Sequence, residues 1–173
     1  MNNITLIGMP GSGKSTTGVI LAKLLSFEFI DTDILIQLNL KRSLQDIVDK
    51  EGHIFLRRVE EDEILKISPD RCVISTGGSA VYSKKAMAHL SSFSVICFLR
   101  ADFSVIEKRI VNFDQRGIAK AGDQSFYDLF MERQPLYEKY ADIEIDCNSL
   151  SQEEAAGVIA ERIMGLPGLK KPA

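Results

Sequence analysis

The sequence predicts a single α/β domain in which a parallel sheet of five strands carries helices on both faces. Short apolar runs alternate with segments of helical periodicity through the 173 residues, and no internal repeat or linker interrupts them. Such alternation is typical of parallel sheets, because each strand returns to the sheet through a crossover helix. Hydrophobic residues make up 45% of the chain, which is enough for a packed core.

Five short apolar runs are the expected strands, since continuous apolar segments of this length suit strands that are buried on both faces. In chain order they cover residues 4–7, 27–30, 72–75, 94–99 and 143–146.

Helical patterns fill most of the intervals between the strands. Ser43 with Asp46, and Ser151 with Glu154, have capping-box spacing and mark two helix starts, and Gly52 is expected to divide the longest helical segment. The expected helices cover residues 14–25, 43–67, 84–90, 103–111, 126–140 and 151–164. Residues 112–124 lack periodicity and predict a mobile loop, and residues 165–173 predict a frayed tail.

Composition argues against several classes of protein. The net charge of −3 does not suit a nucleic-acid-binding surface, and no apolar run is long enough to span a membrane. The N-terminus begins as a strand rather than as a signal peptide. Cys72, Cys97 and Cys147 are widely spaced and are expected to be buried, reduced thiols, while His53 and His89 are isolated. We expect a cytoplasmic monomer that acts on a small molecule.

Residues 8–15 match the phosphate-binding pattern G-x-x-x-x-G-K-[ST] at every fixed position, between a predicted strand and a predicted helix. The glycines let backbone N–H groups cradle phosphate oxygens, and the helix N-terminus adds partial positive charge. Lys14 is expected to reach the β- and γ-phosphates of ATP, and the Ser15 hydroxyl to bind Mg²⁺. The expected nucleotide-binding residues are Gly11, Ser12, Gly13, Lys14, Ser15 and Thr16.

Asp31 and Asp33 follow the second strand and, if the strand continues, point to the same side. One carboxylate would help to hold Mg²⁺, and the other would orient and deprotonate an acceptor hydroxyl. The alternative is an acidic turn with a helix cap at Asp33.

Arg57 and Glu60 lie three residues apart on a predicted helix and share a face, as a surface ion pair or as an arginine held to grip an anion. Gly77 and Gly78 follow the third strand, where they make either a simple turn or a close approach to a ligand. Two further arginines stand out. Arg133 lies in a helix that Pro135 could kink, and Arg116 lies in the predicted loop, either exposed or closing over ATP.

Taken together, the segments GMPGSGKST, DTD, LRRVEED, STGG and ERQPLY resemble the shikimate kinases in order and spacing, over about residues 4–164. The resemblance implies a P-loop NTPase fold of the nucleoside-monophosphate-kinase type, with a five-stranded parallel sheet and a lid at 112–124. It also implies Mg·ATP-dependent phosphorylation of the shikimate 3-hydroxyl in aromatic amino acid biosynthesis.

The resemblance assigns roles residue by residue. Asp31 would help to place Mg²⁺, and Asp33 would act as the base. Arg57 and Arg133 would clamp the shikimate carboxylate. The supporting residues would be Glu60, bracing Arg57; Gly77 and Gly78, contacting the substrate; Arg116, the lid arginine; and Arg109, near the adenine.

The chain departs from the family pattern at the acceptor walls and the lid. The lid reads Arg-Gly-Ile-Ala from Arg116 where Arg-Pro-Leu-Leu is usual, and Ser79 replaces a third glycine. Val48 and Leu56 stand where phenylalanine often packs on the shikimate ring. Two alternatives follow: a kinase for another hydroxylated carboxylic acid, or a nucleotide-binding protein that has lost catalysis.

Overall fold

The computed structural model describes residues 2–110, 117–121 and 124–165. Five strands form one parallel sheet in the spatial order β2–β3–β1–β4–β5. The strands are β1 (Asn3–Ile7), β2 (Glu28–Asp31), β3 (Cys72–Ser75), β4 (Ser94–Arg100) and β5 (Ile143–Asp146). All five carboxyl ends therefore lie at one edge of the sheet, where ligands bind in open α/β folds.

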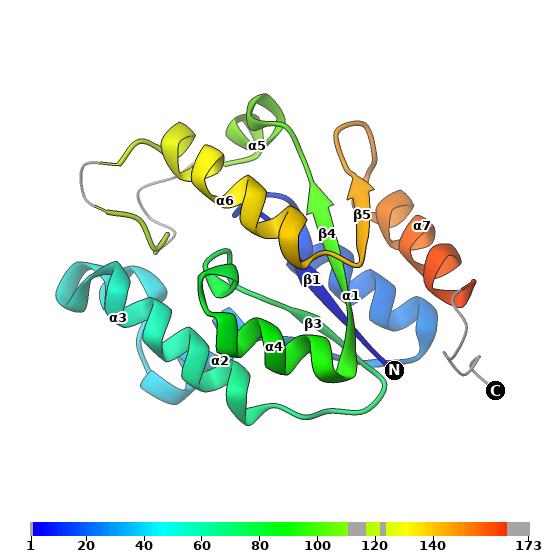
Figure 1. Ribbon diagram of the computed structural model, residues 1–173, viewed down its shortest axis with the longest axis horizontal. Coiled ribbons are helices and arrows are strands. Elements are labelled where there is room, and N and C mark those ends of the chain that lie inside the picture. Colours follow the sequence, from blue (N-terminus) through cyan, green and yellow to red (C-terminus); the bar gives the residue numbers. More distant parts are fainter. Residues whose placement is uncertain (1, 111–116, 122–123, 166–173) are drawn as a thin grey trace.

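Helices cover both faces of this sheet (Figure 1). On one face lie α1 (Lys14–Leu25) and α7 (Gln152–Met164), and on the other lie α4 (Lys84–Phe93) and α6 (Phe126–Tyr140). The pair α2 (Thr32–Leu40) and α3 (Leu44–Lys66) connects β2 to β3, and α3 packs against α4. Two short helices follow strands: the 3-10 helix η1 (Ala80–Tyr82) after β3, and α5 (Phe103–Arg109) after β4.

The core consists of two layers that the sheet separates. Along β1 the side chains alternate between them: Ile4 and Leu6 pack beneath α1 and α7, and Ile7 packs beneath α4 and α6. All three are fully buried. This explains why the strands are continuous apolar runs, since helices cover both faces of the sheet and successive side chains point to opposite faces.

The five predicted strands are confirmed, each within one residue of its expected bounds. The break at Gly52 is also confirmed, because its backbone has φ 82° and ψ 168° inside α3. The helix at Lys84 continues to Phe93, three residues beyond its expected end, and α6 continues through Pro135. Residues 112–116, 122–123 and 166–173 lie outside the described residues, so the mobile lid and the frayed tail stay predictions.

The interpretation of Asp31–Asp33 as a continuing strand is wrong. Helix α2 begins at Thr32, and Asp31 is its N-cap: the Asp31 carboxylate accepts hydrogen bonds from the backbone N–H groups of Asp33 and Ile34, at 3.0 and 3.3 Å. Capping two free N–H groups stabilises a helix start. The cap is Asp31 rather than Asp33, which leaves the Asp33 side chain free to enter the site.

Two expectations from composition can be compared with the structure. Cys72, Cys97 and Cys147 are buried and form no disulfide. Within the described residues, no helix is long and apolar enough to cross a membrane.

Candidate functional site

A cavity of about 640 Å³ opens at the carboxyl edge of the sheet. Its walls come from the loop after β1, the start of α2, the helix α3, the turn after β3 and the described part of the 117–121 segment. The lining residues are Pro10, Gly11, Gly13, Lys14, Ser15, Thr16, Asp33, Leu44, Leu56, Glu60, Thr76, Gly77, Gly78, Ser79, Arg109, Gly117, Ile118, Ala119, Arg133 and Gln152.

The loop between β1 and α1 forms a cradle of backbone N–H groups. Gly11 and Gly13 have φ values of +84° and +98°, which other residues rarely adopt. Gly13 is the N-cap of α1 and offers no side-chain partner to the first N–H groups of that helix. These groups therefore face the cavity with the positive end of the helix dipole, which is the arrangement that binds phosphate.

Lys14 carries the positive charge at this end of the cavity. Its Nζ donates to the carbonyl oxygens of Gly8 and Met9, at 2.8 and 3.0 Å, so the side chain folds back over the loop. Burial lowers the pKa of Lys14 to about 8, against the opposing influence of Asp33 and Asp31. A bound phosphate would raise this pKa again, because a nearby anion stabilises a buried cation.

Ser15 and Asp31 lie together below the loop. The Ser15 hydroxyl donates to Asp31 Oδ2 at 2.7 Å, and the Ser75 hydroxyl is 3.4 Å from Ser15 Oγ. A hydroxyl and a carboxylate are hard oxygen ligands of the kind that Mg²⁺ prefers. No group of three or more His, Cys, Asp or Glu side chains that could hold a metal occurs in the part of the chain that the structure describes. Phosphate and water oxygens would have to complete the coordination.

The carboxyl groups of Asp33 and Glu60 face each other beside the turn after β3. A Cβ atom built on Gly77 would lie 2.5 Å from Asp33 Oδ1 and would also overlap Glu60 Oε1, so only glycine fits between them. Burial, together with Asp31, raises the pKa of Asp33 to about 6. Burial, together with Asp33, raises the pKa of Glu60 to about 7. Like charges this close favour a shared proton, so the two groups titrate as a pair.

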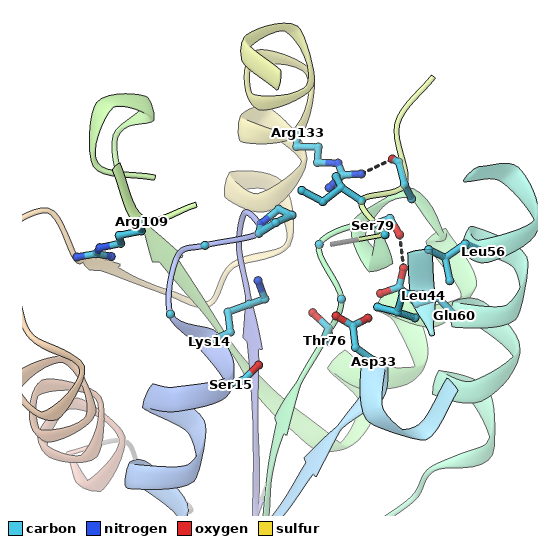
Figure 2. Close-up of a pocket in the computed structure, with 18 of the residues that line it drawn as sticks. Lys14, Ser15, Asp33, Leu44, Leu56, Glu60, Thr76, Ser79, Arg109 and Arg133 are labelled. Carbon is cyan, nitrogen blue, oxygen red and sulfur yellow. Dashed lines mark hydrogen bonds between the residues drawn. The ribbon is translucent and has the colours of Figure 1, made fainter. Parts of the chain in front are cut away.

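The expected ion pair between Arg57 and Glu60 is not formed in the described part of the chain. Glu60 Oε2 instead accepts a short hydrogen bond from the Ser79 hydroxyl, drawn as a dashed line in Figure 2. The identity of residue 79 decides which partner Glu60 has, because a glycine at this position would have no hydroxyl group to donate. No direct hydrogen bond joins Glu60 to Arg57 among the described residues, and the role of Glu60 as a brace stays a prediction.

Arg57 and Arg133 meet at one backbone oxygen. Arg133 is 1% exposed and its NH2 donates to the Ala119 carbonyl at 2.7 Å, as Figure 2 shows. The NH2 of Arg57 reaches the same oxygen at 3.4 Å. Arg57 is half-buried and is not one of the lining residues. Two guanidinium groups that converge on one oxygen can bind a carboxylate, because each carboxylate oxygen accepts hydrogen bonds of this kind.

Arg109 lies at the opposite end of the cavity from Glu60 and Leu56, with Lys14 between them (Figure 2). Its NH2 donates to the Cys147 carbonyl at 3.2 Å. Gln152, the first residue of α7, lies beside Gly13: a Cβ atom there would be 3.6 Å from the Gln152 side chain. The cavity thus extends from Arg109, past Lys14, to Glu60 and Leu56 (Figure 2).

Known proteins have sequences similar to this one. The sequence model of the shikimate kinase family matches residues 10–164. A shikimate kinase of Thermodesulfovibrio yellowstonii is 38% identical over 159 residues, covering 90% of this chain and 91% of that protein. The chain belongs to the shikimate kinase family.

Two further comparisons agree. A shikimate kinase of Pasteurella multocida is 36% identical over 168 residues, covering 95% of this chain and 94% of that protein. The structure of the Acinetobacter baumannii shikimate kinase in complex with shikimate matches with a TM-score of 0.89 and 28% identity, covering 98% of this chain and 96% of that one. The family consists of ATP-dependent small-molecule kinases. The match to a solved structure of this family confirms the predicted fold class.

The structure brings most of the predicted site residues to one cavity. Three predicted residues do not line it: Ser12 is buried within the loop, Asp31 accepts from the Ser15 hydroxyl, and Arg57 donates to the Ala119 carbonyl. Arg116 is outside the described residues, and its role stays a prediction. The eleven others in the cavity wall are Gly11, Gly13, Lys14, Ser15, Thr16, Asp33, Glu60, Gly77, Gly78, Arg109 and Arg133.

Sequence reasoning missed part of the acceptor wall. Leu56 lines the cavity as expected and is 4% exposed, but Val48 does not: it packs against a cluster that includes Ile36 and Ile47. Leu44 and Ile118 contribute to the wall instead. No periodicity in a single sequence indicates these residues, because they meet only when the 117–121 segment lies on α3.

Proposed function

We propose that this chain transfers the γ-phosphate of Mg·ATP to the 3-hydroxyl of shikimate, as a step of aromatic amino acid biosynthesis. One observation carries the proposal: a single cavity joins a phosphate cradle to two arginines that meet at one oxygen, with a carboxyl group of raised pKa between them. Membership of the shikimate kinase family supports the choice of acceptor.

At the nucleotide end, the backbone cradle and Lys14 would hold the β- and γ-phosphates, and Arg109 would lie near the adenine. Ser15 and Asp31 would hold Mg²⁺, whose bound charge neutralises the phosphate oxygens. The direct Ser15–Asp31 hydrogen bond supports this assignment, since both oxygens already point at one place.

At the acceptor end, Arg57 and Arg133 would bind the carboxylate of the acid. Asp33 would orient the hydroxyl and accept its proton, and its raised pKa makes it a better proton acceptor near neutral pH. The Ala119 carbonyl occupies the two guanidinium groups in this structure, so the acceptor's carboxylate would have to displace it. Arg116, outside the described residues, would add positive charge to the transition state.

The test is a coupled ADP-release assay with shikimate, shikimate methyl ester and a set of linear hydroxy acids. We expect turnover of shikimate to the 3-phosphate, identified by NMR, and a KM for the ester about 10- to 100-fold higher, because one charge-assisted contact is lost. Equal KM values for acid and ester would remove the carboxylate clamp.

A second candidate has its own observation. The acceptor wall is aliphatic, built from Leu44, Leu56 and Ile118, and such side chains grip a flat ring less tightly than aromatic ones. A different hydroxylated carboxylic acid would suit this wall. Turnover of a linear acid without turnover of shikimate would favour that candidate. If none of the acceptors in the panel gives ADP release, the result would favour a protein that has lost phosphotransfer.

A further inference from the structure

The ring of Tyr82 lies beside both arginines of the acceptor end. Tyr82 is the last residue of η1, which follows the turn after β3. The Cζ atom of Arg57 lies 3.7 Å from the centroid of this ring, and the Cζ atom of Arg133 lies 5.3 Å from it. Both distances fall within the range of cation–π attraction, about 6 Å. One neutral ring therefore contacts two positively charged side chains, Arg57 of α3 and Arg133 of α6.

The hydroxyl group holds this ring in place. Tyr82 donates to Glu132 Oε1 at 2.6 Å and accepts from Arg133 Nε at 3.4 Å. Burial, with the bond to Glu132, raises the pKa of Tyr82, so the hydroxyl stays protonated at neutral pH. The other Glu132 oxygen accepts from Gln124 Nε2 at 2.5 Å, which joins the tyrosine to the segment before α6.

Arg57 has little else to fix its position. Its bond to the Ala119 carbonyl is long, at 3.4 Å, and its buried Nε has no hydrogen-bond partner among the described residues. In the same part of the chain no carboxylate forms a salt bridge with Arg57. Glu60, which lies three residues further along α3, is bonded to Ser79 instead. Within the described residues, the face of Tyr82 and the long bond to Ala119 are thus the contacts that hold this guanidinium group.

We propose that Tyr82 is a positioning residue for an anion site: its ring holds the Arg57 and Arg133 guanidinium groups so that both donate to a single oxygen position. The Ala119 carbonyl oxygen marks that position in the structure. Holding two cations ready lowers the ordering cost when an anion binds. The inference rests on the proposed function only in taking the anion to be the carboxylate of the acceptor.

The kinetic test compares Tyr82→Leu with Tyr82→Phe, and uses Tyr127→Leu as the matched control. Tyr127 is 51% exposed and packs edge-on against Phe103, away from the arginines. We expect Tyr82→Leu to raise the KM for shikimate about 3- to 30-fold, or about 0.7–2 kcal/mol, with kcat and the KM for ATP near wild type. Tyr82→Phe keeps the ring and should stay within about threefold of wild type.

The methyl ester separates positioning from a structural role. Because the ester lacks the charge that the arginines bind, its KM should not change in Tyr82→Leu. An equal loss for acid and ester, or a KM for shikimate within about twofold of wild type, would overturn the proposal. If Tyr82→Leu does not fold, Tyr82→Met makes the same comparison.

A second measurement does not depend on turnover. In wild type, the ring current of Tyr82 should shift the Arg57 Nε–H resonance, assigned through its loss in Arg57→Lys. The shift should persist in Tyr82→Phe and disappear in Tyr82→Leu, and an unchanged resonance in Tyr82→Leu would overturn the proposal. Failure of wild type to phosphorylate shikimate would instead count against the proposed function, while the resonance would still decide the role of Tyr82.

Discussion

Asp33 lies at the point where the nucleotide end and the acceptor end of the cavity meet. It enters the site from the first turn of α2, because Asp31 takes the capping position before it. Burial and the neighbouring Asp31 carboxylate make its ionised form costly, and Lys14 and Arg133 offset part of that cost. This balance suits a group that must be ionised to accept a proton yet basic enough to take it.

Asp33→Asn keeps the shape of the side chain and removes its ability to accept a proton. We expect kcat to fall by about 10²- to 10⁴-fold, with little change in the KM for ATP, as measured in the coupled ADP assay. Asp62→Asn, an exposed carboxyl on α3, is the control and should behave as wild type. A loss of less than about fivefold would mean that Asp33 is not the base.

Lys14→Ala removes the cation that the P-loop sequence places next to the phosphates. We expect turnover to be abolished, because the transferred group loses its electrostatic partner in the transition state. Lys23→Ala, an exposed lysine of α1, is the matched control. A Lys14→Ala enzyme with near-normal kcat would show that the phosphate site is assigned wrongly.

Glu60→Gln tests the paired carboxyls through stability. The pKa of Glu60 in the folded enzyme, about 7, lies above its ordinary value of 4.5, so the stability associated with its protonated form is present below pH 4.5 and is lost as pH rises through 7. We expect the free energy of unfolding of the ligand-free wild type to fall between pH 5 and 8 by on the order of 1–3 kcal/mol more than that of Glu60→Gln.

Urea denaturation at several pH values measures this difference. Glu107→Gln, which replaces an exposed carboxyl on α5, is the control and should follow wild type. Parallel pH profiles for wild type and Glu60→Gln would contradict the burial argument.

At the scale of elements, the kink at Gly52 gives α3 two tasks. The part before the kink meets the 117–121 segment, where the Gly117 N–H donates to Gln45 Oε1 at 2.7 Å. The part after it carries Leu56, Arg57 and Glu60 to the acceptor end. The carbonyl of Ala119 then lies on the two arginines, so the 117–121 segment covers the acceptor end in this structure.

Gly117→Ala should release this segment from α3. Gly117 has φ +59°, and a Cβ atom there would lie 2.5 Å from the Gln45 backbone nitrogen. Strain of about 1–2 kcal/mol predicts roughly tenfold faster amide hydrogen exchange at residues 117–120 in the ligand-free enzyme. Gly157→Ala is the control, since a Cβ there meets nothing and should stabilise α7 by about 0.5–1 kcal/mol. Unchanged exchange in Gly117→Ala would contradict the proposed contact between the 117–121 segment and α3.

Ordering of the whole 112–124 lid by ATP and acceptor stays a prediction, and exchange measured with both ligands bound would test it. Arg116→Ala belongs to the same experiment. It should lower kcat more than it weakens ATP binding, because its charge is needed mainly in the transition state.

At the scale of the whole molecule, the site sits at one edge of the sheet and the packing that supports the sheet lies away from it. Ile159 of α7 is fully buried in the layer between α7, α1 and the sheet. Ile159→Ala should therefore lower the free energy of unfolding by about 2–5 kcal/mol in urea, with the KM for ATP near wild type. Glu161→Ala, exposed on the same helix, should change it by less than about 0.5 kcal/mol. A large change in KM with unchanged stability would contradict this separation.

Prediction from sequence succeeded where the signal is local. Five apolar runs, two serine caps and one glycine break indicate the strands and most helix boundaries, because backbone preference and burial act on neighbouring residues. It failed at α2, where Thr32 and Asp33 looked like a continuation of the strand although they begin a helix that Asp31 caps. A carboxylate that caps a helix and one that ends a strand have the same sequence signature over three residues.

By itself, the sequence determined the fold class, the phosphate-binding loop and the family, since each depends on motifs of contiguous residues and their order. Only the tertiary structure decided which side chains touch. It bonded Glu60 to Ser79 instead of Arg57, placed Tyr82 beneath the two arginines, and built the acceptor wall from Leu44 and Ile118 rather than Val48. Such contacts join residues up to about 75 positions apart, and burial, packing and competing hydrogen-bond partners select them in the folded chain.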